Sequence, residues 1–154
     1  MGIEYIHNDR IVVDNAQVLV CTTNSVGVMG AGVAKAFREH IPKLYYRYRK
    51  HCEAHDPKQM VPYVFERGDG KFVYCLHTKL QWWFPSKFEY VEKGLKAFVA
   101  WCQENQIQSI AIPPLGCGNG GLTFEGGCNP EEDIKPLMEQ YLKELDIEVR
   151  IYCP

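Results

Sequence analysis

Short apolar runs alternate with amphipathic stretches along the 154 residues of the chain. Two short runs of consecutive apolar residues, Val18–Val20 and Ile110–Ile112, predict buried strands at residues 18–22 and 109–113. Alternation over residues 3–7 predicts an edge strand. Residues 63–67 and 72–77 flank the turn Gly68-Asp69-Gly70 and predict a hairpin. Residues 148–153 predict the closing strand.

Helical periodicity separates these strands. It predicts helices at residues 32–40 and 43–55, the second burying Leu44, Tyr48 and Cys52 on one face. Ser86-Lys87-Phe88-Glu89 matches a capping box and predicts the start of a long helix. A last helix is expected from about residue 133, with Pro136 in its first turn. The alternation predicts one domain over residues 1–154, an α/β fold built as a three-layer α/β/α sandwich with a mixed central sheet.

Composition narrows the class of protein without naming a function. Hydrophobic residues make up 46% and charged residues 23% of the chain, as in ordinary globular proteins. No apolar run reaches transmembrane length, and the first residues lack the pattern of a signal peptide. Seven cysteines without a CxxC pair predict reduced thiols, and the five histidines fall in different elements. We therefore expect a cytoplasmic protein with no membrane partner, no cofactor and no metal.

Charge is unevenly distributed although the net charge is only −2. Residues 35–50 contain Lys35, Arg38, Lys43, Arg47, Arg49 and Lys50 against the single acid Glu39. Such a segment either guides a polyanion towards a neighbouring site or forms a solvated helix face. Sequence statistics alone favour the second interpretation.

Two glycine-rich segments carry the candidate chemistry. Residues 27–32 and 113–122 each follow a predicted buried strand, and the first runs directly into a helix. Glycine lets backbone N–H groups approach an anion closely, and a helix N-terminus adds donors and partial positive charge. Ligands of α/β sheets bind beyond the carboxyl ends of the strands, where both loops are expected. The pair predicts two walls around one diphosphate-containing ligand.

With Leu76-His77-Thr78-Lys79 between them, the two loops resemble those of the macrodomain family, the ADP-ribose-binding α/β/α fold. The resemblance runs over nearly the whole chain. The segment around Thr78-Lys79, followed by Trp82, Pro85 and Ser86, resembles one branch in particular. That branch holds the DarG antitoxins, which remove ADP-ribose from DNA, and the terminal ADP-ribose protein glycohydrolase.

The resemblance implies a binding role at each matching position. Asp9, or Asn8 in its place, would accept from the adenine amino group. Asn24 would bind the distal ribose, unless its amide only caps the loop. Both loops would hold the diphosphate, largely through backbone N–H groups. The expected ligand-binding residues are Asn8, Asp9, Asn24, Val28, Met29, Gly30, Ala31, Gly32, Val33, Thr78, Pro114, Leu115, Gly116, Cys117, Gly118, Asn119, Gly120, Gly121 and Leu122.

Lys79 is the expected catalytic residue. It would act on C1″ of the distal ribose, either as a nucleophile or as a charge that assists departure of the base. The protein-directed glycohydrolase pairs its lysine with an aspartate in the second loop, where this chain has Gly120, as the DNA-directed antitoxins do. Cys21 and Ala31 also depart from common family residues. Trp83 and Phe84 either stack on an unpaired base or, with Trp82, cap the core.

The resemblance implies a glycohydrolase that removes mono-ADP-ribose from a nucleobase in DNA, thymine being the expected base. Its partners would be ADP-ribosylated DNA and a cognate ADP-ribosyltransferase toxin, and we expect a monomer. Two other functions remain open: a phosphatase for ADP-ribose 1″-phosphate, which would not need Lys79, and a non-catalytic reader of ADP-ribose. Affinity for free ADP-ribose cannot separate the three functions, since all of them predict it, whereas turnover does.

Overall fold

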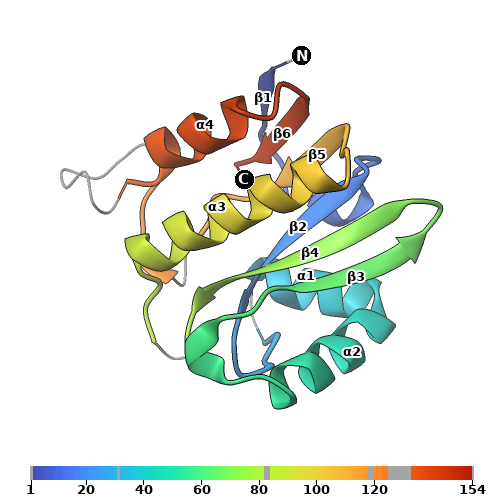
Figure 1. Ribbon diagram of the computed structural model, residues 1–154, viewed down its shortest axis with the longest axis vertical. Coiled ribbons are helices and arrows are strands. Elements are labelled where there is room, and N and C mark those ends of the chain that lie inside the picture. The colour runs from blue at the N-terminus through green and yellow to red at the C-terminus, as the bar shows by residue number, and fades with distance from the viewer. Residues whose placement is uncertain (1, 31, 82–83, 118–119, 125–132, 154) are drawn as a thin grey trace.

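The computed structural model describes residues 2–30, 32–81, 84–117, 120–124 and 133–153. Within these residues, six strands form one sheet in the order β1-β6-β5-β2-β4-β3 (Figure 1). Five strands run parallel and β3 is antiparallel to β4, so the sheet is mixed as predicted. The strands are β1 (Ile3–Ile6), β2 (Val18–Asn24), β3 (Tyr63–Gly68), β4 (Lys71–Lys79), β5 (Ser109–Ile112) and β6 (Glu148–Tyr152).

Helices cover both faces of this sheet. Alternate residues of β2 belong to different cores: Val18 and Val20 face the α3–α4 side, whereas Leu19 and Cys21 face the α1–α2 side. This alternation places two apolar layers on either side of the strands, and the predicted three-layer sandwich is confirmed. The helices are α1 (Gly32–His40), α2 (Pro42–Glu53), α3 (Phe88–Glu104) and α4 (Lys135–Lys143).

The predicted positions of these elements agree closely with the structure. Leu44, Tyr48 and Cys52 form the buried face of α2, and Pro136 lies in the first turn of α4, as expected. The capping-box prediction at Ser86 is wrong. Helix α3 starts after Lys87, which makes no side-chain cap, and the Ser86 hydroxyl instead donates to Thr78 Oγ1 at 3.1 Å.

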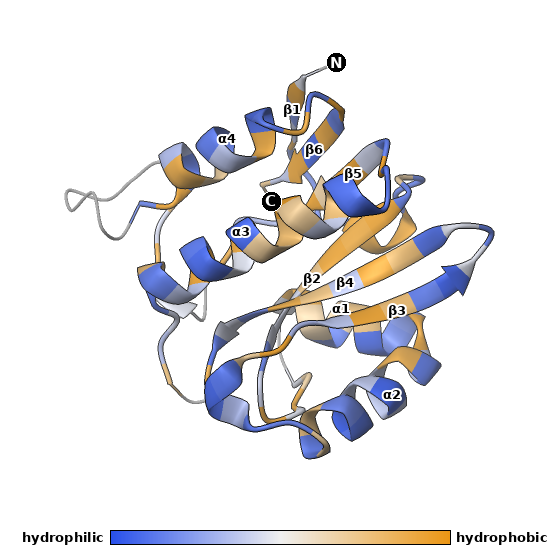
Figure 2. Cartoon of the chain, viewed as in Figure 1, coloured by the Kyte–Doolittle hydropathy of each residue, from blue (hydrophilic) through white to orange (hydrophobic). Residues whose placement is uncertain are grey.

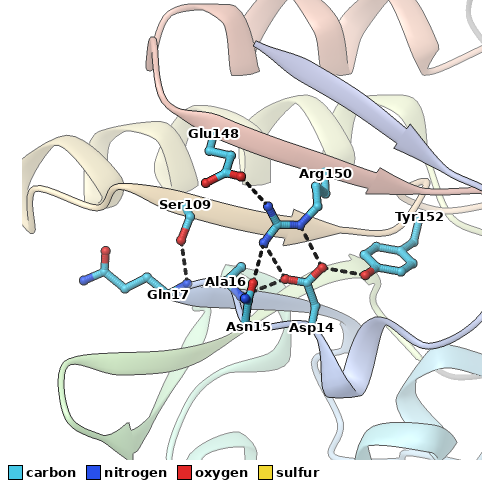
Figure 3. A network of polar contacts seen from close by, with 8 residues as sticks. All are labelled: Asp14, Asn15, Ala16, Gln17, Ser109, Glu148, Arg150 and Tyr152. Atoms are coloured by element: carbon cyan, nitrogen blue, oxygen red, sulfur yellow. Dashed lines mark hydrogen bonds and ion pairs between the residues drawn. The ribbon is translucent and has the colours of Figure 1, made fainter. Parts of the chain in front are cut away.

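A half-buried ion pair holds the chain where it enters β2. The Arg150 guanidinium on β6 donates to both carboxylate oxygens of Asp14, at 2.7 and 2.8 Å, and the Tyr152 hydroxyl donates to Asp14 Oδ2 at 2.5 Å (Figure 3). The Ser109 hydroxyl on β5 accepts the backbone N–H of Gln17 at 2.8 Å. These contacts from two other strands set the start of the central strand that leads to the first glycine-rich loop.

Apolar and hydrophilic residues are unevenly distributed between the sheet and the helices. Figure 2 shows apolar residues concentrated along β2 and β4, whereas α2 is hydrophilic over most of its length and α3 has both hydrophilic and apolar turns. No helix in the described part of the chain has both the length and the apolar character required to cross a membrane.

Candidate functional site

The predicted site residues lie at the carboxyl ends of four parallel strands. Asp9 follows β1, Asn24 ends β2, Lys79 ends β4, and the second glycine-rich loop follows β5. Asn24 and Lys79 are direct partners in the β2–β4 ladder. The strand order therefore places the Lys79 end several strands away from Asp9, across the carboxyl ends of the sheet.

The Asn24 side chain organises the first loop from inside. Its Oδ1 accepts the backbone N–H groups of Val26, Gly27 and Val28 at 3.1–3.2 Å, and its Nδ2 donates to the Val28 carbonyl at 2.8 Å. Asn24 is only 5% exposed. These contacts favour the loop-capping role that the sequence left open for Asn24 over direct contact with a ribose.

Tyr48 on α2 anchors the same loop from below. Its hydroxyl donates to the Asn24 carbonyl and accepts the Asn24 N–H at 3.2 Å. Burial raises the pKa of Tyr48 far above its ordinary value, so the hydroxyl stays protonated and can donate. Helical periodicity identified Tyr48 only as a core residue, because nothing local in the sequence reveals what its hydroxyl meets.

Lys79 is held between the two loops. Its carbonyl accepts the backbone N–H of Ser25 at 3.2 Å, and the Ser25 hydroxyl donates to the next carbonyl, that of Leu80, at 2.8 Å. The Lys79 side chain is half-buried, and burial lowers its pKa below the ordinary value. A partly desolvated amine at the end of a strand is suited to covalent or electrostatic chemistry.

Ser86 connects the second loop to the end of β4. Its backbone N–H donates to the Gly120 carbonyl at 2.8 Å while its hydroxyl donates to Thr78. A β-carbon placed on Gly120 would stand 2.5 Å from Ser86 Oγ and 3.9 Å from Lys79 Cε. The loop backbone at Gly120 therefore passes beside the lysine, and a side chain at position 120 would require Ser86 to shift.

The remaining expected ligand residues divide into several groups. Met29 and Leu115 are fully buried core side chains, so only their backbones are available to a ligand. Gly30, Gly32 and Gly121 are exposed. Gly116, Gly120 and Leu122 are buried, while Val28, Val33, Pro114 and Cys117 are half-buried. Ala31, Gly118 and Asn119 lie outside the described residues, as do Trp82 and Trp83, whereas Phe84 is 41% exposed.

The two candidate adenine contacts differ in their surroundings. Asn8 Oδ1 accepts the backbone N–H of Arg10 at 2.9 Å and closes a turn after β1. Asp9 is exposed at the same strand end. The carboxylate of Asp9 is therefore better placed than the amide of Asn8 to accept from an exocyclic amine.

A buried histidine lies directly before Thr78-Lys79 in β4. His77 Nε2 donates to the Val61 carbonyl at 2.9 Å, so its Nδ1 accepts from the Thr23 hydroxyl at 2.7 Å. Burial lowers the pKa of His77 to about 4. His51 Nε2 donates to the same Val61 carbonyl at 2.9 Å. Both imidazoles serve as structural donors, and among the described residues no three His, Cys, Asp or Glu side chains gather as metal ligands.

The chain is similar to known proteins of one family. A model of the macro domain matches residues 20–129. A Thermus aquaticus protein named DNA ADP-ribosyl glycohydrolase is 40% identical over 142 residues, which cover 90% of this chain and 38% of that protein. The solved macrodomain of Thermus aquaticus DarG superposes with a TM-score of 0.83 at 36% identity, covering 99% of this chain and 98% of that one.

A second set of similar proteins comes from Thermosipho africanus. A DNA ADP-ribosyl transferase–DNA ADP-ribosyl glycohydrolase fusion protein is 31% identical over 156 residues, covering 90% of this chain and 38% of the fusion. The structure of DarTG from that organism, in complex with ADP-ribose, has a TM-score of 0.82 at 28% identity and covers 100% of this chain and 42% of that one. This chain thus spans 38% of the length of both curated relatives.

Proposed function

Because the chain belongs to the macrodomain family, we propose that it is an ADP-ribosyl glycohydrolase which removes mono-ADP-ribose from a nucleobase in DNA. The base we expect is thymine. The names of the Thermus aquaticus and Thermosipho africanus relatives support DNA as the substrate class. The observation that carries the proposal is the position of Lys79, enclosed between the first loop at Ser25 and the second loop at Gly120.

The arrangement of strand ends supports an extended ligand. An adenine at Asp9 and a distal ribose at Lys79 would lie at separate strand ends, with the diphosphate spanning the strands between them. The first loop leads into α1 at Gly32, so that its N–H groups and the helix N-terminus favour the negative charge of the phosphates. Position 120 offers a backbone without a side chain, which lets the second loop approach the distal ribose closely.

The environment of Lys79 supports a nucleophilic role. Its lowered pKa increases the fraction of neutral amine, the form that has a free electron pair. In the proposed reaction the Nζ electron pair forms a bond to C1″ while the bond from C1″ to the base breaks. The base leaves with the electron pair of the broken bond and takes up a proton, while Nζ loses one; water then adds its oxygen to C1″ and a proton to Nζ, which releases the ribose from the lysine. Charge assistance by protonated Lys79 is the alternative, and the pH dependence separates them.

The test is release of ADP-ribose from a single-stranded oligonucleotide that is ADP-ribosylated on thymine. We expect release by the wild type and its loss in Lys79→Ala. Lys71→Ala is the matched control, because Lys71 is an exposed lysine at the opposite end of the same strand. Release by Lys79→Ala at the wild-type rate would contradict the proposed role of the lysine.

Two other outcomes would replace the proposal. Tight binding of the modified strand without turnover would indicate a reader of ADP-ribose. Turnover of ADP-ribose 1″-phosphate that survives Lys79→Ala, without release from DNA, would indicate the phosphatase.

A transferase partner belongs to the same proposed function. The fusion protein of Thermosipho africanus joins a transferase to a glycohydrolase in one chain. We propose that a cognate ADP-ribosyltransferase toxin supplies the modified DNA on which this protein acts. Co-expression with a DNA ADP-ribosyltransferase tests this, since the wild type and not Lys79→Ala should relieve growth arrest.

A further inference from the structure

The outward side of α2 carries a row of cations. Leu44, Tyr48 and Cys52 point into the core, and exposed positions of the same helix hold Lys43, Tyr46, Arg47, Arg49 and Lys50. We call these five residues the basic face of α2. Figure 2 shows α2 as hydrophilic over most of its length, in keeping with this composition.

Aromatic rings lie among these cations. Lys50 Nζ stands 4.8 Å from the ring centroid of Tyr46, which is 62% exposed. Arg49 and Arg38 both approach the ring of Tyr45, at 5.6 and 5.5 Å. The cation–π contacts keep charge beside an accessible ring. Surfaces that bind single-stranded nucleic acid combine these two features, since cations contact phosphates and rings stack on bases.

Few negative charges oppose this face. Glu39 is the single acid in residues 35–50, and it lies 3.9 Å from Lys35 on α1. Glu53 follows at the end of α2. The local excess of positive charge contrasts with the net charge of −2 for the whole chain, so the field around this helix favours a polyanion.

The basic face adjoins the candidate site directly. A β-carbon on Gly27 in the first loop would stand 3.4 Å from Arg49 Cα. Tyr48, on the inner side of the same helical turn, is hydrogen-bonded to Asn24 at the base of that loop. The helix is thus hydrogen-bonded to the loop through Tyr48, and the cation Arg49 lies directly beside the loop backbone.

The strand order shows on which side of the site the group attached to C1″ of ADP-ribose would lie. From Asp9 at β1 the sheet runs through β6, β5 and β2 to Lys79 at β4, and then to the edge strand β3, against which α2 packs. Arg47 of α2 lies 5.6 Å from the ring of Phe65 on β3. If ADP-ribose lies with its adenine at Asp9 and C1″ at Lys79, the group attached to C1″ points towards this edge.

We propose that the basic face of α2 binds the single-stranded DNA that flanks the modified nucleotide. The inference rests on the proposed function, because it needs DNA as the group attached to C1″. Lys43, Arg47 and Lys50 contact phosphates, and the ring of Tyr46 stacks on an unpaired base. The face thereby distinguishes a modified strand from free ADP-ribose, which ends at C1″.

Binding of an unmodified single strand of about 12 nucleotides tests the surface without any turnover. In Lys43→Gln/Arg47→Gln/Lys50→Gln, three cations that would each neutralise a phosphate are removed. We expect Kd to rise on the order of tenfold at low salt. The slope of log Kd against log salt should fall by about 2, because each phosphate neutralised on a single strand contributes roughly 0.7 to that slope.

The matched control is Lys93→Gln/Lys96→Gln/Lys143→Gln. It removes the same three charges from exposed positions of α3 and α4, on the opposite face of the sheet. Equal weakening by both triple variants, or none by the α2 variant, would overturn the proposal. For the ring, Tyr46→Ala should weaken binding several-fold and Tyr46→Phe should retain it. Duplex DNA bound as tightly as the single strand would overturn the stacking role.

Turnover separates this inference from the proposed function. Release of ADP-ribose is measured on a modified oligonucleotide and on the modified mononucleoside, which has no flanking strand. The α2 variant should lose kcat/KM selectively on the oligonucleotide, by a factor similar to the change in Kd. Equal kcat/KM for the variant and wild type on the oligonucleotide would reject the inference and leave the function standing. Absence of release from either substrate by the wild type would reject the function, while the binding data would still test the surface.

Discussion

The hydroxyl oxygen of Ser86 lies 2.5 Å from the point at which a β-carbon on Gly120 would stand. Ser86 also donates its backbone N–H to the Gly120 carbonyl, so the residue that fills this space is held in place by the loop itself. Any side chain at position 120 requires Ser86 to move. The second loop therefore presents bare backbone to Lys79 at this position.

Gly120→Ala should therefore weaken ADP-ribose binding, by about tenfold, and destabilise the fold by about 1–3 kcal/mol through overpacking. Ser86→Gly removes both atoms that the new methyl group would meet, at 2.5 and 3.1 Å. We expect Ser86→Gly to be harmful alone and beneficial in the Gly120→Ala background. The wild type, the two single variants and the double variant are compared by calorimetric titration with ADP-ribose and by urea unfolding. Strictly additive effects of the two substitutions would contradict the predicted coupling.

Lys79→Ala should abolish turnover without abolishing ligand binding. Since the proposed diphosphate contacts are backbone groups of the two loops, ADP-ribose affinity should change by less than about tenfold. The rate of ADP-ribose release should fall by at least about 100-fold, the lower range for loss of a reacting side chain. Single-turnover assays and calorimetry on the same preparations give both values. Comparable losses of affinity and rate would instead indicate that Lys79 mainly binds the ligand.

The pH dependence of turnover should follow deprotonation of Lys79. Burial lowers its pKa from the ordinary value, so the neutral nucleophile becomes populated at lower pH than for a solvated lysine. We expect the single-turnover rate to rise with pH and to level off below about pH 10.4, the ordinary lysine value. Lys71→Ala should give the wild-type profile. A rate that falls with rising pH would show that the protonated amine assists departure of the base.

Asp14 should contribute stability that acid removes. Burial opposes ionisation of this carboxyl, but the hydrogen bonds from Arg150 and Tyr152 outweigh it and hold the pKa of Asp14 below its usual range. Its contribution is therefore present above the unfolded pKa of about 3.9 and is lost as pH falls through the folded value. Asp14→Asn should lower the free energy of unfolding at pH 7 by about 2–3 kcal/mol. Urea titrations should show this gap narrowing towards pH 3, with exposed Glu144→Gln as the neutral control.

Protonation of His77 should destabilise the fold at a higher pH than protonation of Asp14 does. Its pKa is lowered by burial from about 6.5 to about 4, so the folded state resists protonation and stability declines as pH falls between these values. From pH 7 to pH 5 this amounts to about 2 kcal/mol. His77→Gln should flatten that part of the stability profile. Identical profiles for His77→Gln and wild type would contradict the assignment.

Much of the fold could be predicted because its signals are local. The apolar run that ends at Lys79 and the glycine loops after buried strands suffice to place these groups at one edge of the sheet. Ser86 could not be interpreted correctly, because Ser-x-x-Glu is also a helix-capping pattern and its true partners, Thr78 and Gly120, come from other segments. Tyr48 fits a core stripe equally well whether or not its hydroxyl finds Asn24. Groups whose role depends on a distant backbone atom require the structure.

The pairing of β1 with β6 has a consequence for the growing chain on the ribosome. Ile3–Ile6 lies at the edge of the sheet and pairs with residues 149–152, near the other end of the chain. Residues 18–79, by contrast, contain β2, β3 and β4 with α1 and α2; β3 pairs with the next strand β4, and β2 pairs with β4 across the two helices. The half that carries Lys79 and the basic face can thus assemble early in synthesis. The strand that leads to Asp9 is made before the other five described strands, yet it enters the sheet only after β6 has emerged.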